Sequence, residues 1–158
     1  MPSNREWVVL VLFVATCLTG SVIGGMVTSL SVDDWYPTLE KPSFTPPDWV
    51  FAPVWLFLYI SMALAAWLVW LQAGFRHGAV PLGMFFIQLI LNVAWSGLFF
   101  GLRHPGAAFV HLLVLWIVIV ATTVEFWRVR KWAGMLMVPY VLWVIFAGVL
   151  NYSLWQLN

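Results

Sequence analysis

The chain has 158 residues, of which 63% are apolar, 18% are aromatic and only 8% carry a charge. A soluble domain is about 45–50% apolar and about 25% charged, so this composition excludes a soluble enzyme fold. The net charge of +1 provides no basic surface for a nucleic acid. A single cysteine, Cys17, excludes an internal disulfide and a multi-cysteine metal site. The sequence therefore predicts an integral membrane protein.

Five long apolar stretches divide the chain and predict one all-α domain over residues 1–158. A helix needs about 20 residues to cross a hydrocarbon core of about 30 Å. Stretches of this kind predict a bundle of five transmembrane helices, at about 7–30, 49–73, 79–102, 106–127 and 132–155. The last three connections are short and polar, as expected for turns between antiparallel neighbours.

The first connection, residues 31–48, differs from the others because it is long and rich in proline and aromatic residues. Its four prolines exclude a regular helix, while Trp35, Tyr36 and Phe44 give it an apolar side. This composition predicts a Pro/Trp-rich lid that folds over one end of the bundle. We expect Trp35 to lie close to Trp143 of the fifth helix.

Basic residues predict the orientation of the bundle in its membrane. Five of them lie at the N-terminus or in the second and fourth connections: Arg5, Arg76, Arg128, Arg130 and Lys131. The opposite side holds only Lys41 and Arg103. Because Lys and Arg favour the cytoplasmic side, we expect a cytoplasmic N-terminus and an extracytoplasmic lid in a bacterial cytoplasmic membrane.

Polar and aromatic residues recur at helical spacing inside three of the predicted helices. One such face is formed by Gln88, Asn92, Trp95 and Phe99; another by Trp55, Tyr59 and Met62; and a third by Trp143, Ala147, Leu150 and Asn151. An unsatisfied amide in hydrocarbon costs several kcal/mol, so the amides should face the bundle interior. There they would either bond neighbouring helices or orient a flat apolar ligand in a pocket.

Prolines and glycines bear on how closely these helices pack. Pro53 and Pro139 are expected inside the second and fifth helices, where each favours a kink that opens space. The small-residue pairs Gly20–Gly24 and Gly97–Gly101 permit close helix contact. That contact is compatible either with packing inside the bundle or with the face of a homodimer.

The intramembrane residues carry no catalytic or metal-binding constellation. Of the three histidines only His111 lies within a predicted span, and we expect it to be a hydrogen-bonded packing residue rather than an axial haem ligand. The absence of a carboxylate inside the spans weighs against a proton-coupled carrier. No metal site is predicted.

Three segments resemble one known family. Residues 35–55 read WYPTLEKPSFTPPDWVFAPVW, residues 88–96 read QLILNVAWS and residues 138–152 read VPYVLWVIFAGVLNY. They closely resemble the translocator protein family, also known as TspO/MBR, the tryptophan-rich sensory proteins or the peripheral-type benzodiazepine receptors. The resemblance covers essentially the whole chain, and the five-helix plan of that family is the one predicted above.

The resemblance implies a membrane receptor or sensor for tetrapyrroles such as protoporphyrin IX and for related flat hydrophobic ligands, with no further cofactor. It leaves two alternatives open: light-dependent porphyrin degradation through Trp35 and Trp143, and passive transport of porphyrin or sterol. The expected ligand-binding residues, taken from the family by position with Gln88 added from helical spacing, are Trp35, Pro42, Trp49, Trp55, Tyr59, Gln88, Asn92, Trp95, Trp143, Ala147 and Leu150.

The fifth helix departs from the sterol-recognition pattern of the animal members of this family. Val149 and Tyr152 match that pattern, but Gln156 stands where a basic residue is expected. Such patterns are weak even when complete. We therefore expect a porphyrin rather than cholesterol as the natural ligand.

Overall fold

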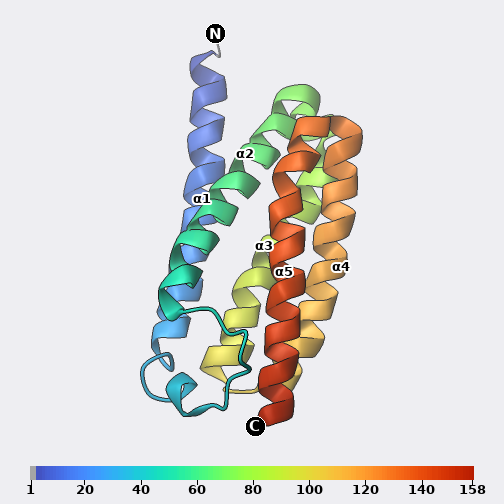
Figure 1. Ribbon diagram of the computed structural model, residues 1–158. Coiled ribbons are helices and arrows are strands. Elements are labelled where there is room, and N and C mark those ends of the chain that lie inside the picture. The colour runs from blue at the N-terminus through green and yellow to red at the C-terminus, as the bar shows by residue number, and fades with distance from the viewer. Residues whose placement is uncertain (1–2) are drawn as a thin grey trace.

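The computed structural model of the protein describes residues 3–158 as a bundle of five long helices (Figure 1). The helices are α1 (Asn4–Ser29), α2 (Phe51–His77), α3 (Ala79–Ser96), α4 (Pro105–Val129) and α5 (Lys131–Leu157). All five are long and apolar enough to cross a membrane. The predicted five-helix membrane fold is confirmed.

The bundle has two different ends, because an odd number of spans leaves the chain termini on opposite sides. The N-terminus lies at one end, while the lid between α1 and α2 and the C-terminus lie at the other (Figure 1). The lid contains two short 3₁₀ turns, η1 (Tyr36–Thr38) and η2 (Asp48–Val50). We call the two ends the N-terminal end and the lid end.

Local capping signals explain where α1 and α4 begin. The Ser3 hydroxyl accepts a hydrogen bond from the Glu6 amide, and the Glu6 carboxylate accepts one from the Ser3 amide. This reciprocal capping box starts α1 three residues before the predicted helix. The Nδ1 atom of His104 accepts from the Ala107 amide, and Pro105 occupies the first position of α4, where its missing N–H costs nothing.

The structure corrects the prediction for Pro53 and the predicted turn at residues 74–78. Because α2 begins at Phe51, Pro53 lies in its first turn and removes no internal hydrogen bond. Helix α2 is assigned to His77, with non-helical geometry at Gly74 (φ 63°, ψ −172°). A glycine adopts this positive φ without steric cost, so the chain turns here without a long polar loop.

Helix α3 ends earlier than predicted, because its last part is wound as a π-helical turn, η3 (Gly97–Gly101). The Leu102 amide donates to the Gly97 carbonyl over 2.8 Å, which is the i to i−5 bond of this geometry. Such turns often occur at functional sites. Here the turn carries Phe99 and Phe100 to the lid end of the bundle.

Three of the four glycines in these pairs, Gly20, Gly24 and Gly101, contact another helix within the bundle, whereas a side chain at Gly97 would meet nothing within 4 Å. A side chain at Gly20 would meet Leu89 and Val93 of α3 at 3.4 Å, so α1 and α3 lie in close contact there. A side chain at Gly101 would meet Val27 of α1 at the same distance. Both contacts use the small residues for packing within one copy of the chain.

Candidate ligand-binding cavity

A cavity of about 390 Å³ opens at the lid end between α1, α2, α3, α5 and the lid. This volume lies in the range of about 300–1,000 Å³ that is typical of small-molecule sites. The lining residues are Ser21, Gly24, Gly25, Thr28, Val32, Tyr36, Asp48, Phe51, Ala52, Trp55, Tyr59, Asn92, Trp95, Ser96, Phe99, Phe100, Trp143, Ala147, Leu150, Asn151 and Leu154.

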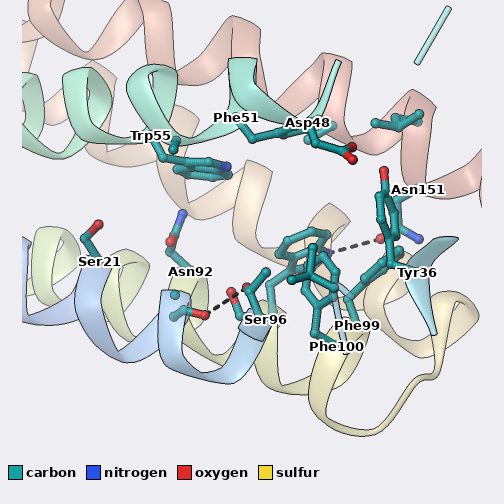
Figure 2. A pocket seen from close by; sticks show the side chains of 18 of the residues that line it. Ser21, Tyr36, Asp48, Phe51, Trp55, Asn92, Ser96, Phe99, Phe100 and Asn151 are labelled. Atoms are coloured by element: carbon teal, nitrogen blue, oxygen red, sulfur yellow. Dashed lines mark hydrogen bonds between the residues drawn. The ribbon is translucent and has the colours of Figure 1, made fainter. Parts of the chain in front are cut away.

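Eight of the 21 residues that line the cavity are aromatic. Figure 2 shows Trp55 and Phe51 of α2 on one side, facing Asn92 and Phe99 on the other. The Trp95 ring stacks on Phe99 with a centroid distance of 5.2 Å and an interplanar angle of 24°. These large, flat and largely apolar surfaces suit a flat aromatic ligand.

The inner end of the cavity is closed by a chain of hydrogen bonds across three helices. The Tyr59 hydroxyl of α2 donates to Asn92 Oδ1 of α3 over 2.6 Å. Asn92 Nδ2 in turn donates to the Tyr140 hydroxyl of α5 over 2.7 Å. Both ends of the Asn92 amide therefore bond to the protein, which satisfies the amide within the membrane and fixes its orientation.

A second amide, Asn151, is satisfied in the same way nearer to the lid. Its Oδ1 accepts from Trp95 Nε1 over 3.1 Å, and its Nδ2 donates to the Pro105 carbonyl over 2.8 Å. This pair of bonds joins α3, α4 and α5 and holds the Trp95 ring in place. The lining amides thus position the cavity wall as well as contributing polar atoms to it.

The indole N–H of Trp143 is buried in the wall and has no hydrogen-bond partner among the described residues. Tyr36, the aromatic residue that the lid contributes to the wall, is only 6% exposed. Burial raises the pKa of Tyr36 above its usual value, and the nearby Asp48 carboxylate raises it further. The Tyr36 hydroxyl therefore stays neutral at physiological pH.

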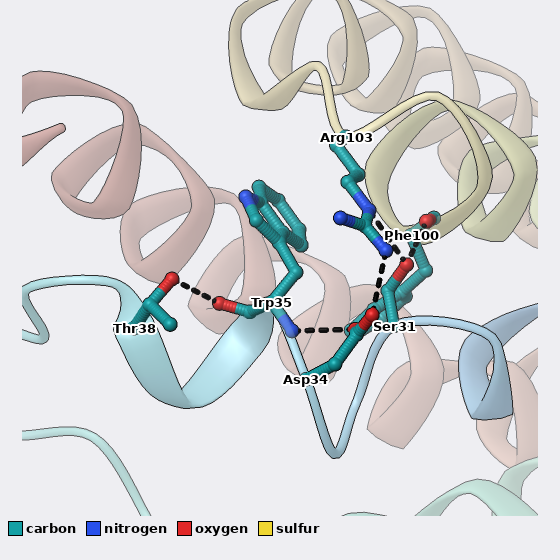
Figure 3. Close-up of polar contacts among 6 residues, drawn as sticks. All are labelled: Ser31, Asp34, Trp35, Thr38, Phe100 and Arg103. Carbon is teal, nitrogen blue, oxygen red and sulfur yellow. Dashed lines mark hydrogen bonds and ion pairs between the residues drawn. The ribbon is translucent and has the colours of Figure 1, made fainter.

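Arg103 ties the start of the lid to the connection between η3 and α4 (Figure 3). Its guanidinium donates to the Ser31 hydroxyl over 3.1 Å and to the Asp34 carboxylate over 2.9 Å. The Ser31 hydroxyl also donates to the Phe100 carbonyl over 2.7 Å. Arg103 adopts a left-handed backbone conformation with φ 52°, which is uncommon for a residue with a side chain.

The end of α5 anchors the middle of the lid. The Asn158 side chain accepts from the Glu40 amide over 2.9 Å and donates to the Glu40 carbonyl over 3.0 Å. Phe44 packs edge-on against Phe146 of α5, with a centroid distance of 6.5 Å. Together with Arg103, these contacts hold the lid at both its first and its middle part.

The structure brings seven of the eleven predicted site residues together in the cavity wall. These seven are Trp55, Tyr59, Asn92, Trp95, Trp143, Ala147 and Leu150. They come from α2, α3 and α5, the three helices on which helical spacing predicted a common inward face. The structure thus places the predicted faces around one space.

The other four predicted residues lie outside the cavity wall. Gln88 is buried but lies one helical turn below Asn92, where its Nε2 contacts the Met62 sulfur at 3.6 Å. Trp49 is 75% exposed in η2, and Pro42 forms a turn within the lid with Thr45. Trp35 packs on Phe99 at 5.7 Å rather than lining the cavity.

Trp35 and Trp143 pack against different rings. The Trp143 ring packs against Phe51 at 6.0 Å and Phe146 at 5.3 Å, and the described residues include no ring contact between the two tryptophans. Tyr36 is the lid residue that lines the cavity instead. Both Trp35 and Tyr36 contact the Phe99 ring, but only Tyr36 lies in the cavity wall.

Sequence reasoning missed the wall contributed by α1. Ser21, Gly24, Gly25 and Thr28 line the cavity. Their positions follow the i, i+3, i+4, i+7 spacing of one helix face, so a signal was present. It is a face of small residues, which indicates close packing as readily as a cavity.

His111 behaves as predicted from the sequence. Its Nε2 atom lies 2.8 Å from the Leu91 carbonyl of α3, so the ring joins α4 to α3 by a hydrogen bond. His111 does not line the cavity.

The fold and the cavity define the class of the molecule. It is an integral, multi-pass membrane protein of five helices with a lidded aromatic cavity inside the bundle. The sequence pattern of the TspO/MBR family matches residues 13–156. The chain belongs to the TspO/MBR family, which confirms the resemblance found in its sequence.

Relatives from distant organisms share nearly the whole chain. The tryptophan-rich protein TspO of Chlorobaculum tepidum is 43% identical over 157 residues, which cover 98% of this chain and 99% of the relative. The translocator protein of Bos taurus is 39% identical over 96% of this chain and 91% of its own. The tryptophan-rich sensory protein of Cereibacter sphaeroides is 35% identical over 98% of this chain and 94% of its own.

Proposed function

We propose that this protein is a membrane receptor or sensor that holds protoporphyrin IX, or a similar flat hydrophobic ligand, in the lidded cavity. The observation that carries the proposal is a cavity of about 390 Å³ whose wall includes three indole rings, those of Trp55, Trp95 and Trp143. Such rings offer a macrocycle stacking surface on several sides. The relatives include proteins named as a sensory protein and as a translocator protein, which agrees with a ligand-binding role.

Different residues of the wall would make different kinds of contact with the ligand. The indoles and Phe99 supply apolar contact. The hydrogen-bonded chain of Tyr59, Asn92 and Tyr140 forms the inner end of the cavity and so limits how deeply a ligand enters. The unpartnered indole N–H of Trp143 is a donor for an acceptor atom on the ligand. Tyr36 and Asp48 of the lid lie at the end of the cavity away from Asn92 (Figure 2), where they would contact the outer edge of a bound ligand.

The test is a titration of the purified protein with protoporphyrin IX after substitution of Ala147. Ala147→Phe places a ring in the cavity and should weaken binding by about tenfold or more, which corresponds to about 1.4 kcal/mol. Val149→Phe is the matched control, because Val149 lies on the same helix, is 52% exposed and does not line the cavity. Equal affinity for both folded variants would show that the ligand binds elsewhere.

The second candidate function is light-dependent degradation of a bound porphyrin. The observation that favours it is the position of Trp143 in the cavity wall, because indole is the most easily oxidised aromatic side chain. Trp143→Phe should then retain binding but lose degradation under illumination, with a smaller effect of Trp35→Phe, whose ring lies outside the wall. Equal bleaching by both variants, the wild type and an unrelated membrane protein would exclude this activity.

We also propose that the N-terminal end faces the cytoplasm, because it carries five of the seven basic residues. A membrane-impermeant thiol reagent should then label Asp33→Cys in the lid of intact cells but not Arg76→Cys. The native Cys17 is fully buried and does not interfere. The opposite labelling pattern would reverse the orientation.

A further inference from the structure

One charged side chain lies in the wall of the cavity. Among the lining residues, all of which fall within the described part of the chain, only Asp48 carries a formal charge. It belongs to η2, which directly precedes α2, so its position is fixed by the start of that helix. Asp48 is exposed, and its carboxylate therefore keeps contact with water at the mouth of the cavity.

Tyr36 faces Asp48 at this mouth. Figure 2 shows the Asp48 carboxylate and the Tyr36 hydroxyl pointing toward one another from η2 and the opposite part of the lid. Tyr36 is only 6% exposed, and burial together with the nearby Asp48 carboxylate raises the pKa of its hydroxyl. A carboxylate only accepts hydrogen bonds, whereas a phenol both donates and accepts. The pair therefore offers more accepting than donating capacity.

The neighbouring cation lies outside the wall. The Lys41 ammonium lies 4.1 Å from the centroid of the Tyr36 ring and does not line the cavity. Lys41 and Asp48 form no ion pair with each other within the described chain. Both charges belong to the lid, but only the negative charge of Asp48 lies in the cavity wall.

We infer that the Asp48–Tyr36 pair makes the cavity select its ligands by charge, favouring an N–H donor or a cationic group at the lid end and disfavouring an anion there. This inference rests on the proposed function, since it concerns the ligand held in the same cavity. An anionic group would meet the Asp48 carboxylate on the cavity side and would be accommodated only by reaching past it to Lys41. A porphyrin is therefore held best when the group that it places at the lid end is not an anion.

The experiment compares two probes that share one macrocycle, protoporphyrin IX with two carboxylates and its dimethyl ester with none. Affinities are measured for the wild type, Asp48→Asn and Asp33→Asn, all purified in the same detergent. Asp33→Asn is the matched control, because Asp33 is an exposed lid carboxylate that does not line the cavity. The ratio of the two affinities, compared between variants, removes the different partitioning of the probes into detergent.

Asp48→Asn should shift this ratio by about three- to tenfold in favour of the dicarboxylate, the size expected for unit charges several ångströms apart near water. The affinity for the ester should stay unchanged, as should the ratio in Asp33→Asn. Raising the ionic strength should reduce the effect, because salt screens exposed charges.

Two different failures are distinguishable. If Ala147→Phe abolishes binding of both probes but Asp48→Asn leaves their ratio unchanged, the cavity is the binding site and the inference on charge is overturned. If neither probe binds, or if Ala147→Phe has no effect on either, the proposed function itself fails and the inference falls with it. Comparable thermal unfolding of all variants confirms that each is folded.

Discussion

The lid end and the N-terminal end of the bundle use opposite packing strategies. Toward the N-terminal end, α2 presents small side chains to the core, including Ala63, Ala65 and Ala66, all with no exposed surface. At the lid end the same helix presents Trp55 and Tyr59, and a cavity remains between the helices. Rings also occur in the packed half, where Phe85 contacts Phe13 and Phe126 at centroid distances of 5.9 and 6.3 Å, so the cavity depends on how the rings are arranged and not on their presence alone.

One bundle therefore combines a closely packed half with a half that has room for a ligand. The packed half supplies the stability that fixes the helices in position. The open half is then free to carry rings and amides whose arrangement serves binding rather than density. Substitutions that add volume should therefore have opposite consequences at the two ends.

The largest expected effect tests the packed end directly. A side chain at Gly134 would lie 2.6 Å from Trp127 Cε3 and 2.8 Å from Trp127 Cα, and a backbone atom cannot easily move away. Gly134→Ala should lower the free energy of unfolding by about 1–3 kcal/mol, the usual cost of overpacking. Thermal unfolding in detergent measures the loss.

The matched change at the open end is Gly25→Ala. A side chain at Gly25, which lines the cavity, would meet nothing within 4 Å. Since alanine is a better helix former by about 1 kcal/mol, the stability of this variant should stay level or rise. An equal loss of stability in both variants would abolish the distinction between the two ends.

An intermediate effect is expected at the boundary between the two halves, where Tyr140 accepts from Asn92. Tyr140→Phe retains the ring but leaves a buried amide donor without its partner, at a cost of about 1 kcal/mol. Tyr152→Phe is the control, since Tyr152 is 47% exposed and makes no hydrogen bond through its hydroxyl within the described chain. An unchanged thermal midpoint for Tyr140→Phe would show that the chain does not brace the inner end of the cavity.

The smallest effect on stability is expected in the lid. Arg103→Met removes two hydrogen bonds of an exposed group, so the free energy of unfolding should fall by less than about 1 kcal/mol. Hydrogen exchange of residues 31–39 should nevertheless accelerate, because the lid loses its first anchor. Arg128→Met, which breaks the Glu125 ion pair at the N-terminal end, should leave exchange in the lid unchanged.

The fold was predictable because a membrane imposes a strict rule on the backbone. Polar backbone groups within the bilayer must bond internally, so an apolar stretch of sufficient length becomes a helix. The structure departs from the predicted helices at places where this rule does not determine the backbone geometry. The backbone reversal at Gly74 and the π-helical turn of η3 satisfy their hydrogen bonds in other ways, and apolarity alone does not distinguish them from an ordinary helix.

The sequence predicted which helix faces point into the bundle, but not how far along each face the cavity extends. Helical spacing identified the inward face that carries Asn92 and Trp95, yet Gln88 on the same face lies four residues, or about 6 Å, beyond the end of the cavity. The lid was less predictable still, because its residues follow no period. There Trp49 points outward, while Asp48 beside it lines the cavity.

The anchoring of the lid by Asn158 has a consequence for the order of folding. Glu40 and Asn158 are separated by 118 positions along the chain, and Asp34 and Arg103 by 69. Chains are synthesised from the N-terminus at about 5–20 residues per second, so the lid is made several seconds before α5 is complete. The anchor of the lid on Arg103 can therefore form before the anchor on Asn158, which has to follow the synthesis of α5.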